Sequence, residues 1–205
     1  DTGNGSIEEK MGKIFYIMGK SSSGKDTIYQ KLLAQKQNTL HTIVMYTTRP
    51  IRDGEKNGIE YFFVNEAQAE QMEKEGKIIE LRSYRTVLGI WKYFTARDEQ
   101  IDLGHQDYLM IGTLQSYRKM VQCFGKEQIV PILIELDDGI RLQRALDREK
   151  MQKHPNYQEL CRRYLADDED FSEEKLKEAG VEKRFYNDDL ESCLTDIRAY
   201  IEERR

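Results

Sequence analysis

One short stretch near the N-terminus limits the possible folds of this chain more than any other. An apolar run, Ile14–Met18, is followed directly by a glycine- and serine-rich turn in which Gly19, Gly24 and Lys25 have the spacing Gly-x-x-x-x-Gly-Lys. A helical pattern then covers residues 26–34. A buried strand, a glycine turn and a helix in this order are typical of a parallel sheet with crossover helices, so we expect an α/β fold.

This turn has the composition of a loop that binds phosphate groups. The two glycines permit backbone angles that direct successive N–H groups inward, and the N-terminus of the following helix adds partial positive charge. Lys25 can reach terminal phosphates, and a hydroxyl group shortly after the lysine can bind Mg²⁺. Asp26 stands where Ser or Thr is usual, so we assign the metal to Thr27. The alternative is an ordinary glycine turn with an exposed lysine. We expect the phosphate-binding residues to be Gly19, Ser21, Ser22, Ser23, Gly24, Lys25, Asp26 and Thr27.

The composition excludes several classes of protein. Of the 205 residues, 39% are hydrophobic and 34% are charged, which is enough apolar material for one globular domain or for one domain with an inserted subdomain. The net charge of −5 argues against a general nucleic-acid or membrane-surface protein, because those need a basic face. No apolar run approaches the roughly 20 residues of a membrane span. With nucleic acids and membranes disfavoured, small molecules are the expected partners. The protein itself is expected to be a monomer or a homodimer.

The expected location is the cytoplasm. The chain opens without a secretory leader, its three cysteines are widely spaced, and its three histidines form no metal-binding pattern, so reduced thiols are the default. Residues 1–10 are expected to be a loose tail or a tag remnant, with Met11 as the true start.

Short apolar runs and helical patterns alternate along the remainder. We predict further strands at residues 42–46, 61–64, 77–82, 108–112 and 129–136. Helices are predicted from the Asn65 cap to Gly76, over residues 116–124, from an aspartate cap at 137 or 138 to about 150, and from about 188 onward. Residues 152–183 are rich in acidic side chains; a metal-binding cluster is one interpretation, and a solvated helix is the favoured one.

A second motif follows the strand predicted at residues 42–46. Residues 47–64 read TTRPIRDGEKNGIEYFFV, with two arginines three apart and a tyrosine after a glycine-bounded turn. Guanidinium groups bind phosphate through two parallel hydrogen bonds, although arginines in a turn are usually solvated. Together with the phosphate loop, this block closely resembles the guanylate kinases, the P-loop nucleoside monophosphate kinases that phosphorylate GMP with ATP.

The resemblance implies a fold and a set of site residues. It implies a three-layer α/β/α core with a five-stranded parallel sheet over residues 11–45, 109–150 and 171–205, a β-rich insertion at 46–108 that binds the nucleoside monophosphate, and a helical lid at 150–170. It implies ATP and Mg²⁺ on one side, bound by the loop residues above and by Arg144, Arg148 and Asn187, and GMP on the other, bound by Arg49, Arg52, Tyr61, Glu80 and Tyr93. The catalytic group implied is Lys25, Arg49, Arg148 and Arg163, and Glu80 is expected to accept hydrogen bonds from the guanine edge.

The sequence departs from the family pattern among the residues that read the base. Met45 stands where serine is common, the family's Tyr-Gly-Ser turn aligns with Leu88-Gly89-Ile90, and an aspartate is missing from residues 110–113. Tyr84 and Tyr93 are candidates to replace the lost tyrosine. Losing hydrogen-bond partners relaxes base selectivity. Two alternatives therefore remain: a related kinase for another nucleoside monophosphate or for ribose 1,5-bisphosphate, and a non-catalytic guanylate-kinase-like domain that binds protein ligands.

Overall fold

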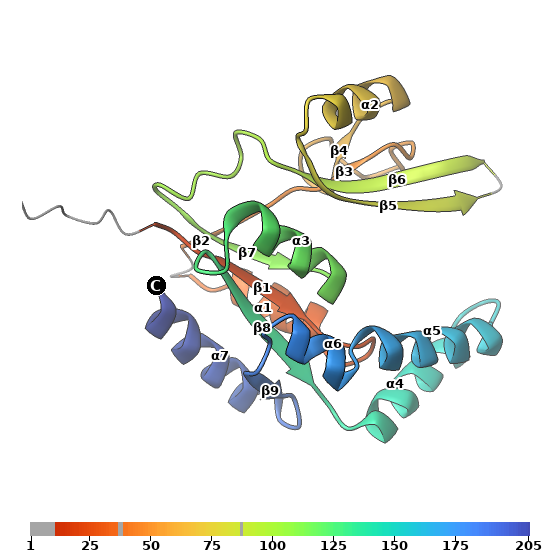
Figure 1. The fold of residues 1–205 in the computed structure, drawn as a ribbon. Helices are drawn as coiled ribbons and strands as arrows, with labels where there is room; N and C mark the ends of the chain where they lie inside the picture. Colours follow the sequence, from red (N-terminus) through yellow and green to blue (C-terminus); the bar gives the residue numbers. More distant parts are fainter. Residues whose placement is uncertain (1–10, 37–38, 87) are drawn as a thin grey trace, which may run out of the picture.

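The computed structural model describes residues 11–36, 39–86 and 88–205 (Figure 1). The tail expected at residues 1–10 lies outside these described residues. The strands are β1 Ile14–Met18, β2 Leu40–Thr42, β3 Tyr46–Thr47, β4 Phe62–Phe63, β5 Ile78–Thr86, β6 Gly89–Ala96, β7 Asp107–Ile111, β8 Ile129–Glu135 and β9 Arg184–Tyr186. The helices are α1 Lys25–Leu33, α2 Glu66–Lys74, α3 Leu114–Phe124, α4 Asp138–Lys150, α5 Tyr157–Asp170, α6 Glu173–Glu178 and α7 Leu190–Arg204.

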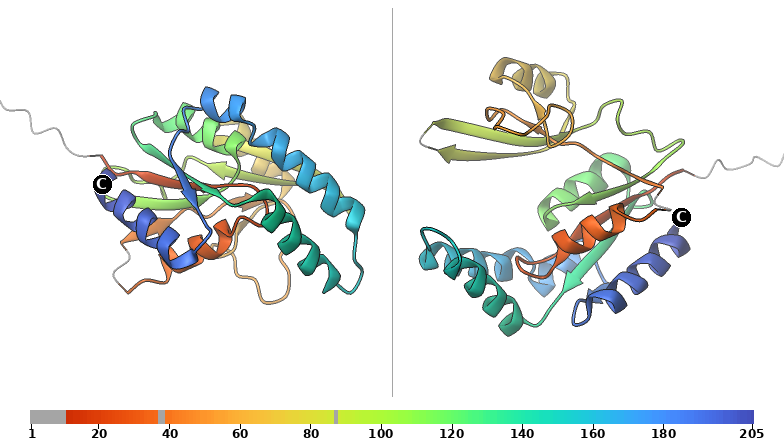
Figure 2. Two further views of the ribbon diagram at one scale, coloured as in Figure 1. Left: turned by 90° about the horizontal axis from the view of Figure 1, so that it is seen from below. Right: turned by 180° about the vertical axis from the view of Figure 1, so that it is seen from behind.

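The centre of the molecule is a five-stranded parallel sheet in the order β2-β7-β1-β8-β9. Its middle strand, β1, is completely buried, because it pairs with β7 on one side and β8 on the other and has helices on both faces. The alternation of side chains divides β1 between two cores. Tyr16 joins the cluster that packs under α3 and α6, whereas Phe15 and Ile17 join the cluster under α1 and α7. The ribbon views show helices on both sides of the central sheet (Figure 2). The expected three-layer α/β/α fold is confirmed.

A second, smaller sheet lies beyond β2, in the order β4-β3-β6-β5. All its strands come from residues 46–96, between β2 and β7 of the central sheet, so the chain leaves the core and returns to it. The long antiparallel β5–β6 hairpin projects away from α2 at one edge, above the ends of α4 and α5 (Figure 1). Because α3 packs against β5, the hairpin is anchored to the core.

Local capping signals fix several of the boundaries. Asn65 forms a capping box with Gln68 at the start of α2, and Asp137 accepts a hydrogen bond from the N–H of Ile140 at the start of α4. Gly125, with φ of 91°, ends α3. These predictions are confirmed.

Three strand assignments from the sequence need correction. The prediction of one continuous strand at residues 42–46 is wrong. Residues 43–45 connect β2 of the central sheet to β3 of the smaller sheet and belong to neither strand. The amide of Val44 bonds the Gln100 side chain and not a strand. β6 was not predicted, and neither was β9, whose three residues give too short a pattern. The charged stretch at residues 152–183 contains the helices α5 and α6, and helical structure was the favoured prediction for it. Each helix buries one leucine, Leu160 in α5 and Leu176 in α6.

Within the described ranges, no group of three His, Cys, Asp or Glu side chains is arranged to hold a metal ion. None of the helices formed by the same residues has the length and apolar character needed to span a bilayer.

One close packing contact joins two strands of the central sheet. Gly112 follows β7, and a Cβ atom added there would lie 2.1 Å from the hydroxyl oxygen of Tyr16 and 3.0 Å from the ring carbon that bears it. The large side chain on β1 therefore occupies the space that a side chain at position 112 would need.

We predict that Gly112→Ala destabilises the protein by about 1–3 kcal/mol, because overpacking forces rearrangement of the buried ring. The measurement is the free energy of unfolding in denaturant. A Tyr16→Leu background, which removes the ring, should reduce the effect of Gly112→Ala. An equal effect in both backgrounds would show that Tyr16 is not the obstacle.

Candidate functional site

The phosphate loop, Gly19 to Lys25, connects β1 to α1 and leaves the start of that helix open. Ser22 and Gly24 both have left-handed backbone angles, with φ of 65° and 89°. Gly24 is the N-cap of α1, and in the described structure no side chain caps the first turn. The N–H groups of that turn are therefore free to bind an anion, which the helix dipole also favours.

The side chains of the loop support this interpretation. Lys25 is 19% exposed and lies 3.7 Å from the carboxylate of Asp26. Asp26 and Thr27 are exposed on the first turn of α1. The buried hydroxyl of Ser23 has no hydrogen-bond partner among the described residues. A buried polar group without a partner is costly, and a phosphate oxygen is a suitable partner for it.

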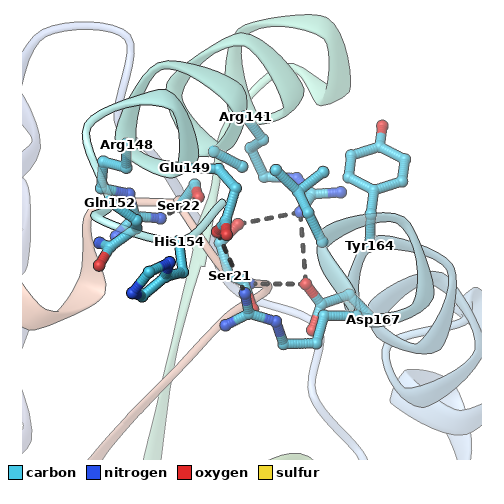
Figure 3. Close-up of a pocket in the computed structure, with 12 residues that line it drawn as sticks. Ser21, Ser22, Arg141, Arg148, Glu149, Gln152, His154, Tyr164 and Asp167 are labelled. Carbon is cyan, nitrogen blue, oxygen red and sulfur yellow. Dashed lines mark hydrogen bonds and ion pairs between the residues drawn. The ribbon is translucent and has the colours of Figure 1, made fainter. Parts of the chain in front are cut away.

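A cavity of about 390 Å³ lies between the loop, α4 and α5 (Figure 3). Ser21 and Ser22 form one wall, and Arg148 donates a hydrogen bond to the Ser22 hydroxyl. Arg163 lines the same cavity and lies 3.7 Å from Glu149. Two of the predicted arginines thus meet the phosphate loop at one cavity.

Acidic side chains of α5 contact the loop directly. The carboxylate of Asp167 accepts a hydrogen bond of 2.9 Å from the backbone N–H of Ser21 (Figure 3). Lys20 donates to Asp168 at 2.6 Å and lies 3.4 Å from Asp138. Burial opposes the charged form of Lys20, but the hydrogen bond to Asp168 together with the negative charges of Asp138 and Asp168 outweighs it, so the pKa of the lysine is raised. A carboxylate of the protein, that of Asp167, therefore occupies a backbone N–H donor of the phosphate loop.

The sequence analysis did not predict the part played by Arg141 of α4. This side chain is 1% exposed, donates to the Ser21 carbonyl at 3.0 Å and stacks over the ring of Tyr164 at 4.7 Å. It also bonds Asp138 at 2.8 Å, and this bond lowers the pKa of the carboxylate. Arg144, which was predicted instead, is exposed. The available signal was the seven-residue spacing of Arg141 and Arg148, which places both on one face of α4.

Asn187, expected near an adenine base, lies beneath the phosphate loop. It is buried, and its side-chain amide donates a 2.8 Å hydrogen bond to the Ser23 carbonyl. A Cβ atom at Gly24 would come within 2.2 Å of the same amide nitrogen. The turn before α7 thus supports the backbone of the loop and requires glycine at that position.

On the inserted sheet, Arg49 is the centre of the predicted phosphate-binding group. It is 5% exposed, forms a bidentate ion pair with Glu55, and lies over the rings of Tyr61 and Phe63 at 5.2 and 5.3 Å. The Arg49 guanidinium, helped by the backbone N–H of Arg52, lowers the pKa of Glu55 to about 2. The carboxylate therefore remains charged and holds the arginine in place.

The structure brings the predicted acceptor residues together. Tyr93 of β6 contacts the ring of Tyr61 at 5.6 Å, and a hydrogen bond with Tyr93 contributes to the raised pKa of Arg49, after the larger contribution of Glu55. Arg52 is exposed in the adjoining turn. We refer to Arg49, Arg52, Tyr61 and Tyr93 as the arginine–tyrosine cluster.

Glu80 of β5 is buried in the same β5–β6 hairpin, two residues from Arg82, which pairs with Tyr93. It is 7% exposed and accepts a 3.0 Å hydrogen bond from the hydroxyl of Thr95, its partner across the strands. The Nε atom of Arg82 lies 3.4 Å from its other oxygen. A cleft of about 720 Å³, here called the α3 cleft, runs beside this pair. It is bounded by Arg82–Tyr84 of β5, by α3 with its cap Thr113, and by Asp170 and Lys175.

This geometry corrects the expected alignment of the Tyr-Gly-Ser turn. Leu88 and Ile90 are exposed at the tip of the β5–β6 hairpin, five residues or more along the strands from the Glu80–Thr95 pair. Tyr93 and Thr95 occupy the positions opposite Arg82 and Glu80 instead. Tyr93, one of the two candidate tyrosines, therefore lies one pair along the hairpin from Glu80, and the Thr95 hydroxyl lies directly opposite Glu80.

The fold and site together define a P-loop protein of the α/β class, with an inserted sheet that carries a second cationic group. The family model for guanylate kinase matches residues 11–101. A guanylate kinase of Malacoplasma penetrans is 26% identical over 96% of this chain and 96% of its own length. That of Neisseria gonorrhoeae is 39% identical over 39% of this chain and 37% of its own.

Among solved structures, the guanylate kinase of Anaplasma phagocytophilum has the same fold, with a TM-score of 0.60 and 21% identity over 95% of this chain and 86% of that one. The chain is therefore similar in sequence to guanylate kinases over nearly its whole length and shares their fold.

We predict that Asn187→Ala lowers the free energy of unfolding by about 1–3 kcal/mol, because it leaves the Ser23 carbonyl buried without its hydrogen-bond donor. Denaturant titration measures the change, and Asp188→Ala, at the exposed neighbouring position, is the control. Equal stability of the two variants would mean that Asn187 does not support the loop.

Proposed function

We propose that this protein is a kinase that transfers the γ-phosphoryl group of ATP to the 5′-phosphate of GMP, giving ADP and GDP. The observation that carries the proposal is the presence of two anion sites in one molecule. One is the phosphate loop with the open N-terminus of α1, and the other is the arginine–tyrosine cluster beside the buried carboxylate of Glu80. Transfer between two nucleotides requires both, and the similarity to guanylate kinases supports the same reaction.

In this proposal the domains divide as the resemblance implies. The core comprises residues 11–45, 109–150 and 171–205, the insertion at 46–108 takes the acceptor, and the lid is the segment at 150–170. The two anion sites then belong to different parts of the chain, so that closing the parts brings the substrates together.

The chemistry needs positioning and charge neutralisation more than proton transfer. The acceptor is a phosphate whose second pKa is near 6, so it is largely ionised at neutral pH without a general base. Lys25 and Arg148 on the donor side, and Arg49 on the acceptor side, neutralise two polyanions that must meet in line. Arg163, at the far wall of the loop cavity, adds positive charge when the lid closes.

Mg²⁺ is proposed as the cofactor. The oxygens of Asp26 and Thr27, exposed in the first turn of α1, are hard donors of the kind that Mg²⁺ takes together with phosphate oxygens. Thr27 is the proposed ligand, and the ion would neutralise phosphate charge during transfer.

The contact between Asp167 and Ser21 has to yield when ATP binds. The Ser21 N–H that Asp167 occupies belongs to the loop that would receive the phosphates, and two anions cannot share that donor. In the proposed cycle α5 moves, and Arg141 and Arg148 remain on α4 to meet the nucleotide.

Two other functions stay as alternatives. A different phosphorylated acceptor, another nucleoside monophosphate or ribose 1,5-bisphosphate, is compatible with Met45 and with the missing aspartate at residues 110–113, where the family reads the base. A non-catalytic domain that binds proteins would not need the open phosphate loop, and calorimetry with ATP separates it from a kinase. A cytoplasmic location is part of the proposal and agrees with three free cysteines.

The test is ADP release by the purified chain with MgATP against GMP, dGMP, AMP, CMP, UMP and ribose 1,5-bisphosphate. We expect turnover with GMP and a loss of about 10²–10³-fold in Lys25→Ala, since one charge that stabilises the transition state is removed. Lys31→Ala, on the same helix but paired with Glu191, is the matched control. Activity with another acceptor and none with GMP would reject the substrate and keep the reaction class.

The role of the arginine–tyrosine cluster has its own prediction. Arg52→Ala should raise the KM for the acceptor by about tenfold and leave the KM for ATP unchanged, because it removes a charged hydrogen-bond donor to the acceptor phosphate. Lys56→Ala removes an exposed cation from the same turn and should change neither constant. If Arg52→Ala and Lys56→Ala behave alike, Arg52 does not bind the acceptor.

A further inference from the structure

The α3 cleft is a cavity that the proposed reaction does not use. Its volume is about 720 Å³, against about 390 Å³ for the cavity at the phosphate loop. None of the residues proposed above for ATP, Mg²⁺ or the acceptor is among the residues that line it. It forms where α3 lies between the β5–β6 hairpin and α6 (Figure 1 and Figure 2). Its size is within the range of small-molecule sites, about 300–1,000 Å³.

One face of α3 lines this cleft with polar side chains alone. They recur at the helical spacing i, i+3, i+4 and i+7, which places them on the same side of the helix. The four residues are Gln115, Arg118, Lys119 and Gln122, and all are exposed. The opposite side of α3 packs into the core through Tyr117 and Met120. The polar face spans about 10 Å along the helix axis and offers two cations and two amide groups as hydrogen-bond donors.

Two further cations face α3 across the cleft. Arg82 belongs to β5 and Lys175 to α6, so the lining contains four cations and a single carboxylate, that of Asp170. In the whole chain the acidic residues outnumber the basic ones, 37 to 32. The cleft therefore concentrates positive charge in an acidic protein, and a concave surface lined by one sign of charge attracts ions of the other.

The cations on the helices are weakly engaged by the protein itself. Lys119 has no ion pair within the described chain. Arg118 lies 3.6 Å from Glu178, and Lys175 lies 2.9 Å from Glu169. Both of these pairs are at the surface, where an ion pair contributes little to stability. Turning these side chains towards a ligand in the cleft therefore costs little.

The wall formed by β5 adds a guanidinium and an aromatic ring. The Nε atom of Arg82 is buried without a hydrogen bond among the described residues, although it lies 3.4 Å from Glu80. A buried donor of this kind gains from a partner. The ring of Tyr84 is half exposed and contacts the edge of Tyr93, with ring centres 5.6 Å apart. An exposed aromatic face of this kind can stack on a base.

We propose that the α3 cleft binds a ligand with a chain of two or more phosphate groups, at a site separate from both substrate sites. Cations from β5, α3 and α6 surround one small volume, and a phosphate chain carries several negative charges within the same short length. The carboxylates of a peptide are spaced too widely to match them. A free polyphosphate and the phosphate tail of a nucleotide share this chemistry, and the ring of Tyr84 would take the base of a nucleotide. The inference holds whatever the acceptor of the kinase is.

A ligand in this position would join two parts of the molecule. β5 belongs to the inserted sheet and α3 to the core, so a phosphate chain bonded to both holds the insertion against the core. Binding to the folded protein then raises its melting temperature.

The test is calorimetry with tripolyphosphate on the Lys25→Ala protein, in which the competing phosphate loop is weakened. We expect binding to persist there and to weaken about tenfold when Lys119→Ala is added, because one charged hydrogen-bond donor is lost. Lys119→Arg keeps the charge and should keep the binding. Lys177→Ala is the matched control, since Lys177 is an exposed cation of α6 that does not line the cleft. The rise in melting temperature with tripolyphosphate should follow the same order and confirms that each variant is folded.

The two sources of a phosphate chain are separated by UTP in the same variants. Affinity equal to that of tripolyphosphate means that the chain alone is recognised, and tighter binding that Tyr84→Ala removes means that a nucleotide is. Three results would overturn the proposal: no binding of tripolyphosphate to Lys25→Ala, equal losses in Lys119→Ala and Lys177→Ala, or a tetraglutamate peptide that binds as tightly as tripolyphosphate.

Discussion

The pairing of β1 with β7 and β8 is the interaction on which the rest of this structure depends. A fully buried central strand holds its own end at a fixed point, and the phosphate loop begins there. The ends of β7 and β8 lie at the same edge, as parallel strands require, so the caps of α3 and α4 are brought beside the loop. Asn187 follows β9 at this edge and reaches the loop from the other side. One sheet edge therefore assembles residues that are far apart in the sequence.

Features that depend on a few neighbouring residues could be predicted from the sequence. The phosphate loop, the Asn65 cap and the parallel fold follow from local chemistry and from the alternation of apolar runs. The transition from β2 to β3 was missed because residues 43–45 are as apolar as a strand, and only the separation of the two sheets shows that they are not one.

The side chains that reach the site from distant helices and strands were harder to predict from the sequence. Arg141 looks like any helical arginine until α4 is seen against the loop, and Thr95 is unremarkable until the hairpin register places it opposite Glu80. Contacts of this kind depend on tertiary packing: the spacing of Arg141 and Arg148 places both on one face of α4, but it does not say that this face meets the loop.

The exclusion between Tyr16 and Gly112 also limits which substitutions this chain accepts. An added Cβ at 112 and the ring at 16 cannot occupy one space, so a side chain at position 112 needs a smaller residue at position 16. The two positions can therefore change only together, or through a form with glycine at 112 and a small residue at 16, which leaves a cavity.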